Sequence, residues 1–459
     1  MAVTIVLARL LSPSEVGIFS ITAVLVSIAH IFRDFGVASY LQREETLTKD
    51  KVGAAFGVLL ASSWSIALVI FLLAPAAASF YKQSGVKDVM QVLALGFVFI
   101  PFGSITNTLL TRDYRAKEQA YVSAVGTVVY ASTAIGLAYM GHSYMSMAWA
   151  NLANIIVAAI AFAPFRPAIA PLLPRFKGWR KVVNFGSGAV LGNSLTMVNN
   201  AIPDLVLGKI SGTHEVGIMS RSLSTTSMFS QLLGPTVNYA ALPYLSRVHH
   251  ANQPLQEPMA RAVAYVTGVM WPALALIYVH AESIILVLYG AKWIECVPIV
   301  QILCLVAIAT TPFSFTNAAY MAIGRPHLTS VPVLMLILLK ALMIYLLFDG
   351  SLASFAYALA GATFLSYPMQ AIMQKKYLGI HTKPFLVAQW RSLIVTAACL
   401  ATSLPWLSFS EVWARPIVLV AVGGTATISW IVALALTQHP LLEEMQRFLR
   451  RKQNGHQAL

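Results

Sequence analysis

The sequence is poor in charged residues. Asp, Glu, Lys and Arg make up 10% of its 459 residues, whereas 58% of the chain is hydrophobic. A soluble domain carries about 25% charged residues, so this composition excludes a soluble globular fold. Cysteine is also scarce. Cys296, Cys304 and Cys399 lie in or beside apolar stretches without CxxC spacing or nearby histidines, so they indicate no redox or metal site.

Long apolar runs dominate the rest of the chain. A run of about twenty residues crosses the ~30 Å hydrocarbon layer as a helix. Besides an apolar stub at 1–11, the runs lie at 16–41, 52–81, 89–111, 120–140, 144–164, 182–210, 217–243, 262–289, 294–323, 328–348, 352–373, 387–407 and 414–437. The sequence therefore predicts an all-α polytopic membrane protein.

The basic residues predict its orientation. When the stub counts as the first helix, 22 of the 31 Lys and Arg residues fall in one set of loops and the C-terminal tail, and six fall on the opposite side. Because these residues collect in the cytoplasm, we expect fourteen spans with both termini cytoplasmic. The net charge of +14 then reflects topology and not nucleic-acid binding.

One stretch occurs twice. "RLLSPSEVGIFS" at 9–20 returns as "KISGTHEVGIMS" at 209–220, with six identities in the fourteen positions that start at Leu7 and Leu207. By this match the stub corresponds to the end of the span 182–210. The first helix is therefore expected to begin roughly twenty residues before Met1, the alternative being a short re-entrant stub.

A second match pairs Asn107 and Arg115 with Asn317 and Arg325. Parallel repeats of this kind build transporters from two similar bundles. The predicted domains are an N-terminal bundle (1–164), a basic cytoplasmic linker (165–181), a C-terminal bundle (182–374), helices 13 and 14 (375–437) and an amphipathic basic cytoplasmic tail (438–459).

These motifs carry a family resemblance. "LARLLSPSEVGIFS" with "FRDFGVASYLQRE", and later "LVLGKISGTHEVGIMSRS", resemble the Wzx-type oligosaccharide flippases of the multidrug/oligosaccharidyl-lipid/polysaccharide exporter superfamily. The resemblance implies flipping of a polyprenyl-pyrophosphate-linked oligosaccharide, or polysaccharide export, across the bacterial plasma membrane by alternating access. It implies no enzyme activity and no cofactor. The implied partners are the lipid-linked oligosaccharide, membrane lipid and the polysaccharide polymerase machinery.

Ionisable residues inside the runs are the candidate site residues, because charge at the bilayer centre costs roughly 2.5–3.5 kcal/mol. Lys340 has long apolar flanks and either binds phosphate or hydrogen-bonds a neighbouring helix. His30 precedes Arg33 by three residues and Asp34 by four, so it can touch both. Either His30 satisfies Asp34 locally, or Arg33 binds the pyrophosphate while Asp34 or His30 carries a proton.

Asp204 and Arg221 lie near the outer ends of two runs. They form either a salt bridge or part of a site in the proline-broken "NNAIPDL", where Asn199 and Asn200 bind sugar hydroxyls or join helices. The predicted substrate-binding residues are Lys340, Arg33, Arg221, Asn199 and Asn200, and the predicted ion-coupling residues are Asp34, Asp204 and His30. No catalytic residue or metal ligand is predicted.

Two other functions compete with the flippase. An ion-coupled exporter of drugs or metabolites would share the fold, but three basic against two acidic residues at membrane depth favour an anionic substrate. A membrane enzyme would need paired carboxylates or a metal set near an aqueous domain. The gaps between runs are too short for such a domain.

Overall fold

The chain is built from helices. The computed structural model describes residues 2–444 and 446 except 35, 172, 176, 177 and 410–413, and describes no side chain at 2, 31, 34, 184–194, 232–240 or 384. No strand occurs among the described residues, and ten helical segments there are long and apolar enough to cross a membrane. The protein is a multi-pass membrane protein. Because its described elements are all helices, the predicted all-α class is confirmed. The count of fourteen spans stays a prediction.

The chain divides into two compact units, Met1–Ser220 and Arg221–Leu459. The helices that begin in the first unit are α1 (Ala2–Leu10), α2 (Pro13–Asp34), α3 (Val37–Arg43), α4 (Lys49–Tyr81), α5 (Ser84–Arg112), α6 (Ala116–Tyr139), α7 (Met145–Phe162), η1 (Ala163–Phe165), α8 (Trp179–Ile210) and α9 (Thr213–Thr226). The unit boundary falls inside α9. The domain limits predicted from the repeat remain a prediction.

The second unit holds the remaining helices. They are α10 (Met228–His250), α11 (Gln256–Val279), α12 (Ala281–Leu288), η2 (Ala291–Trp293), α13 (Cys296–Thr310), η3 (Thr311–Phe313), α14 (Thr316–Ala322), η4 (Pro326–Thr329), α15 (Ser330–Leu347), α16 (Leu352–Leu378), α17 (Thr382–Val387), α18 (Trp390–Ser403), α19 (Trp406–Phe409) and α20 (Arg415–Leu436). Beyond Leu436 the predicted amphipathic tail lies mostly outside the described residues.

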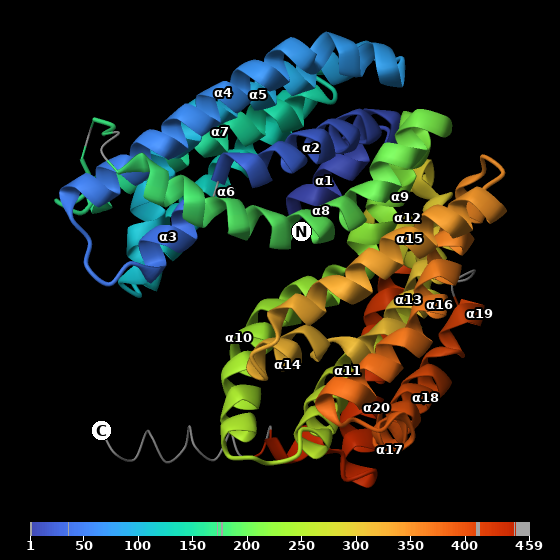
Figure 1. Cartoon of the computed structure of the whole chain (residues 1–459). Coiled ribbons are helices and arrows are strands. Elements are labelled where there is room, and N and C mark those ends of the chain that lie inside the picture. Colours follow the sequence, from blue (N-terminus) through green and yellow to red (C-terminus); the bar gives the residue numbers. More distant parts are fainter. Residues whose placement is uncertain are drawn as a thin grey trace, which may run out of the picture. The chain divides into compact units, whose positions relative to one another are not determined.

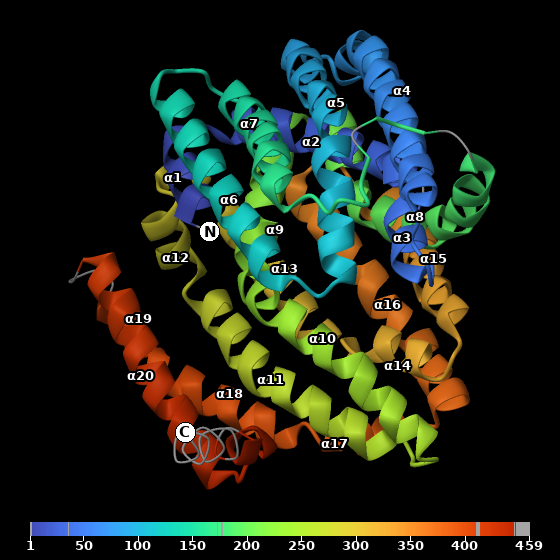
Figure 2. The same cartoon turned by 90° about the vertical axis from the view of Figure 1, so that its left-hand side faces the viewer.

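Long helices form the core of the first unit. In Figure 1, α5 lies between α4 and α7, and Figure 2 shows α6 along α7. Buried side chains such as Val89, Phe97, Ala148 and Leu152 fill the space between these helices. Small residues let the backbones approach closely, which is how membrane helices associate without a hydrophobic driving force between them.

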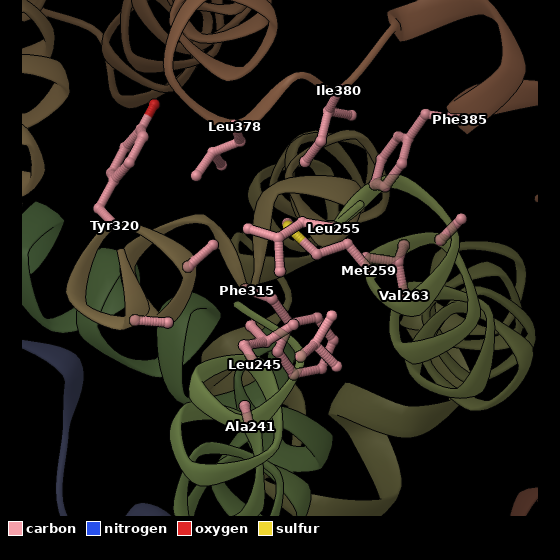
Figure 3. Packing of buried hydrophobic residues seen from close by; sticks show 14 of the residues in the cluster. Ala241, Leu245, Leu255, Met259, Val263, Phe315, Tyr320, Leu378, Ile380 and Phe385 are labelled. Atoms are coloured by element: carbon pink, nitrogen blue, oxygen red, sulfur yellow. The ribbon is translucent and has the colours of Figure 1, made fainter. Parts of the chain in front are cut away.

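The second unit has its own apolar core. Leu245 of α10, Met259 of α11 and Phe315 come together with Ile380 and Phe385 (Figure 3). The chain that joins α16 to α17 therefore closes over the ends of α10 and α11. This contact holds one end of the second unit together.

A buried polar network joins the C-terminal helices to α11. Thr267 Oγ1 lies 3.0 Å from Gln389 Oε1 and 2.8 Å from Ser392 Oγ. Ser392 Oγ in turn lies 3.0 Å from His439 Nε2. Because His439 Nδ1 accepts the Leu441 backbone N–H at 3.2 Å, Nε2 carries the ring proton and donates it to Ser392. The network requires a neutral imidazole.

Several of the predicted runs are broken. The run 16–41 separates into α2 and α3, and the run 262–289 into α11 and α12. The run 217–243 divides after α9, and the run 294–323 is interrupted by η3, which contains Pro312. Each of these four apolar runs therefore contains a break between helical elements. Glycine in the left-handed region explains the first, because Gly36 has φ 62°.

The repeated stretches have the same local structure. The Leu11 N–H donates to the Leu7 carbonyl at 2.8 Å, and the Ser211 N–H donates to the Leu207 carbonyl at the same distance. The two copies therefore end one helix and begin the next in the same way.

The second match is also structural. The Arg115 N–H donates to the Leu110 carbonyl and the Arg325 N–H to the Tyr320 carbonyl, both at 2.9 Å. The residue before each arginine is left-handed, with φ 55° and 72°. Two separate turns thus repeat their hydrogen bonding, which supports an internal duplication of the fold.

The two copies of the repeated stretch lie against each other. A Cβ added to Gly17 of α2 would lie 1.7 Å from the Thr213 carbonyl oxygen, and a Cβ added to Gly217 of α9 would lie 1.9 Å from the Pro13 carbonyl oxygen. Each glycine therefore admits the backbone of the other copy. No other residue leaves room for this approach.

One turn further along, Ser20 Oγ donates to Ser220 Oγ at 3.1 Å. The contact is reciprocal, since each partner has its counterpart at the same place in the other copy. The two copies therefore pack on each other through equivalent positions. We call these contacts the glycine crossing, defined by Pro13, Gly17, Ser20, Thr213, Gly217 and Ser220.

We expect Gly17→Ala to lower the melting temperature of the detergent-solubilised protein, because the new methyl group must force the two backbones apart. Overpacking of this kind costs about 1–3 kcal/mol. Gly136→Ala is the matched control, since a Cβ there meets no atom within 4 Å. An unchanged melting temperature for Gly17→Ala would show that the helices do not cross at this distance.

A second prediction concerns His439. Burial and the nearby Arg391 charge lower its pKa to about 4. The unfolded chain therefore binds a proton between about pH 6.5 and 4 that the folded chain does not. Stability should fall by up to roughly 3 kcal/mol as the pH drops through that window. Thermal unfolding at pH 7.5 and 5 measures the loss, which should shrink in His439→Gln.

Candidate functional site

The candidate site of the first unit lies where α2 ends. The helix stops at Asp34 inside the apolar run, and Gly36 turns the chain into α3. The last carbonyls of a helix carry partial negative charge and need donors. Ser62 Oγ on α4 donates to the Arg33 carbonyl at 2.8 Å, and the Arg33 side chain places its positive charge at this helix end.

Arg33 and His30 form a pair. Arg33 Nη1 lies 2.6 Å from His30 Nδ1, which is the contact that their spacing predicts. A guanidinium only donates hydrogen bonds, so Nδ1 accepts and the imidazole is neutral with its proton on Nε2. Both side chains lie against Phe97 of α5, with 4.5 Å between the two ring centroids and 5.8 Å from the Arg33 guanidinium carbon to the Phe97 centroid. The Asp34 side chain lies outside the described residues.

The helices around this pair contain long stretches without charged residues. Helices α4, α5, α7 and α8 pack on α2. Their stretches 52–81, 89–111, 145–162 and 182–203 contain no Asp, Glu, Lys, Arg or His. A fixed cation in such low-dielectric surroundings attracts an anion much more strongly than it would in water.

Arg221 belongs to the second unit and is 6% exposed. Its guanidinium carbon lies 5.7 Å from the Trp293 ring centroid, in a cation–π contact. The Tyr289 ring lies against the same tryptophan at 6.2 Å, and its hydroxyl lies 3.0 Å from Thr225 Oγ1. The ion pair predicted between Arg221 and Asp204 would join the two units and stays a prediction.

Lys340 lies half-buried in the middle of α15. The exposed residues Leu334, Leu338 and Leu342 form a stripe along this helix at four-residue spacing. Lys340 is two residues from the last two of them and so lies on the opposite side of the helix. The apolar stripe suits contact with lipid. The Lys340 side chain lies on the opposite side of the helix from this stripe.

The asparagines of α8 lie next to each other. Asn199 Nδ2 donates to Asn200 Oδ1 at 3.4 Å, with Asn199 half-buried and Asn200 exposed. Their role in binding sugar remains a prediction, as do the roles of the other candidate residues.

Two basic residues have contacts that sequence reasoning missed. Arg112 donates through Nη1 to the carbonyls of Leu41 and Glu44, at 2.6 and 2.5 Å, and so caps the end of α3. Lys209 donates to the Phe80 carbonyl at 2.7 Å, and its ammonium lies 3.8 Å from the Phe80 ring centroid. The distribution of Lys and Arg over the loops predicts only on which side of the membrane Arg112 and Lys209 lie. Their carbonyl partners are distant in sequence.

The second unit contains an apolar cavity of about 520 Å³. Residues of α11, α12, α18 and α20 line it, among them Pro272, Ile284, Cys399 and Gly423. His280 also lines the cavity, is 2% exposed and has no hydrogen-bond partner for Nε2 within the described part of the chain. The apolar lining of the cavity suits a hydrocarbon chain. The sequence did not predict this cavity.

Solved structures share this fold. A lipid II flippase MurJ in an inward closed conformation superposes with a TM-score of 0.73 over 96% of this chain and 98% of that chain, at 11% identity. An inward-facing multidrug resistance MATE family transporter gives 0.60 over 85% and 93%, at 15% identity. The chain therefore has the same fold as these two membrane transport proteins.

The sequence comparisons assign the family. Residues 6–298 match the family described as polysaccharide biosynthesis protein. This match covers more than half of the chain, which belongs to that family. The resemblance of the sequence to Wzx-type flippases is thereby confirmed.

Relatives agree with this assignment. The lipopolysaccharide biosynthesis protein WzxC of Escherichia coli K12 is 19% identical over 96% of this chain and 91% of its own length. The teichuronic acid biosynthesis protein TuaB of Bacillus subtilis is 20% identical over 82% and 80%. The succinoglycan biosynthesis transport protein ExoT of Rhizobium meliloti is 23% identical over 67% and 63%.

Proposed function

We propose that this protein flips a polyprenyl-pyrophosphate-linked oligosaccharide across the bacterial plasma membrane by alternating access. The observation that carries the proposal is the cation of Arg33 at the end of α2, next to stretches of α4, α5, α7 and α8 that contain no Asp, Glu, Lys, Arg or His. A pyrophosphate supplies the anion that such a cation attracts. Relatives named for lipopolysaccharide, teichuronic acid and succinoglycan biosynthesis support a saccharide as the cargo.

The substrate is amphiphilic, and the two units contain features that suit its two parts. Arg33, Arg221 and Lys340 are proposed to bind the pyrophosphate, with Asn199 and Asn200 on the sugar. The apolar cavity of the second unit accepts a hydrocarbon chain. Asp34, Asp204 and His30 are proposed as ion-coupling residues.

The remaining parts of the proposal follow from the charge pattern and the family. The protein has fourteen spans and both termini in the cytoplasm, and its partners are membrane lipid and the polymerase that extends the saccharide. It acts as a transporter and not as an enzyme, as the names of its relatives and structural neighbours support.

Export of drugs or metabolites is the second candidate function. The similarity to a multidrug transporter favours it, although that similarity is one of fold. Acidic cavities suit cationic drugs, whereas the described centre of the first unit contains Arg33 beside a neutral His30. Expression of the protein should leave the susceptibility of cells to cationic drugs unchanged. A gain of resistance would favour the exporter.

Replacement of Lys340 tests the proposed anionic substrate. We expect Lys340→Met to lower transport about tenfold or more, because a hydrogen bond to a charged group is worth about 1.5–3 kcal/mol. Lys340→Arg keeps the charge and should retain most of the transport. The measurement is the lipid-linked saccharide that accumulates on the inner leaflet of cells relying on this protein, beside the amount of protein in their membranes. Equal losses of protein and transport would make Lys340 a structural residue.

The cavity offers a matched pair of variants. A Cβ at Gly423 or at Gly424 meets no atom within 4 Å, but only Gly423 lines the cavity. We expect Gly423→Phe to fill it and lower transport of the lipid-linked saccharide severalfold, whereas Gly424→Phe leaves transport unchanged. Equal transport by both variants would mean that no part of the substrate enters the cavity.

A further inference from the structure

One polar group in the apolar cavity of the second unit has no protein partner. His280 lines the cavity and is 2% exposed, and its Nε2 has no hydrogen-bond partner within the described part of the chain. The other polar side chains of the lining each have one, namely Thr225, Cys399, Thr427 and Trp430. Because buried polar groups almost always have a partner, the open nitrogen of His280 indicates that something else binds there.

The cavity is elongated, with two helix faces as its longer walls. Its lining on α11 runs from Val269 to His280, and its lining on α20 runs from Leu419 to Trp430. In both helices the lining residues recur every three or four positions, which is the spacing of a single face. At 1.5 Å per residue each wall is about 16 Å long. The helix α18 packs on both α11 and α20 and adds Cys399 to the lining.

The two ends of the cavity differ in chemistry. At one end Trp430 Nε1 donates to the Gly268 carbonyl at 2.7 Å, which ties α20 to α11. At the other end Arg415 Nη2 on α20 donates to Glu282 Oε1 at 3.3 Å. Since Glu282 follows His280 by two residues, the open imidazole belongs to this second end. The two helices are therefore antiparallel, and the polar atom without a partner lies at one end of an otherwise apolar lining.

The same end lies close to a residue that is already proposed to bind the pyrophosphate. Thr225 of α9 lines the cavity, and its Oγ1 lies 3.0 Å from the hydroxyl of Tyr289, which directly follows α12. Arg221 precedes Thr225 by four residues, so the two share a face of α9 and lie one turn apart. The helix α12 begins directly after His280. A chain whose head lies at His280 therefore has Arg221 near that head.

We propose that His280 binds the oxygen that joins the prenyl chain of the substrate to its pyrophosphate, and that the chain runs from there along the cavity toward Trp430. The inference rests on the proposed function and adds a binding residue and a direction to it. An amphiphile has its hydrogen-bonding atoms at one end of its chain, as this cavity has at one end of its lining. The Nε2–H of the imidazole donates, and the phosphate ester oxygen accepts.

The direction of the chain can be tested by photocrosslinking. The probe is farnesyl pyrophosphate that carries a diazirine at the far end of its chain. It is bound to the full chain in detergent, and the crosslinked residues are identified by mass spectrometry. We expect crosslinks near Trp430 on α20 and near Val269 on α11, which line the end of the cavity away from His280. Crosslinks near Leu419 and His280 instead would place the head at the opposite end and overturn the proposal.

Replacement of His280 separates a binding role from a structural one. His280→Phe keeps a planar ring and removes both nitrogens. We expect its affinity for the probe to fall about tenfold, because a hydrogen bond to a charged group is lost. Its melting temperature should be equal or higher, because the buried group that is removed has no protein partner. His280→Gln keeps a donor and should retain more of the affinity than His280→Phe does.

His327→Phe is the matched control, because His327 is an exposed histidine of the same unit. It should bind the probe as the wild type does. Unchanged affinity in His280→Phe would mean that water satisfies the imidazole, and the proposal would be wrong. A loss of affinity together with a lower melting temperature would make His280 a structural residue and overturn the proposal in the same way.

A second probe tests for a different occupant. A phosphatidylglycerol with a diazirine on one acyl chain should not label the cavity when farnesyl pyrophosphate is present. Labelling that farnesyl pyrophosphate does not displace would make the cavity a site for membrane lipid and overturn the inference. The proposed function stands in all these cases as long as the wild type binds farnesyl pyrophosphate elsewhere. Failure of the wild type to bind it at all would remove the proposed substrate together with this inference.

Discussion

Charge in hydrocarbon is the constraint on which this structure depends. A cation at the bilayer centre must find partners within the protein, because lipid offers none. In the first unit Arg33 lies at the end of α2 against a neutral imidazole and an aromatic face. Arg221 in the second unit lies on Trp293. Aromatic faces and a neutral imidazole are thus among the groups that surround these two cations.

The all-α class followed from composition, because few charges and repeated apolar runs leave no alternative. The sequence identity between 9–20 and 209–220 was enough to predict that the two stretches share a local structure, and both form the same turn. The breaks were not predictable. Apolar periodicity does not distinguish one helix from two with a turn between them, as at Gly36 and Ser227. At membrane depth such turns depend on tertiary partners, for example the Ser62 hydroxyl.

The candidate site was predictable only in part. Spacing along one helix was enough to place His30 against Arg33, because both lie on the same face. The position of Phe97 and the capping of α3 by Arg112 depend on residues far apart in the chain. The apolar cavity draws its lining from α11, α12, α18 and α20, and each residue in it resembles ordinary core in the sequence. Contacts across helices decide these features, and periodicity contains no information about them.

The glycine crossing has a consequence for how the two copies of the repeat can change. Gly17 is fitted to the backbone of the later copy and Gly217 to the backbone of the earlier one. After duplication, a larger side chain in either copy would collide with the main chain of its twin, which no compensating side-chain replacement can move. The close approach therefore accounts for a glycine at this position in both copies, whereas Pro13 and Thr213, which present only a backbone carbonyl to it, differ.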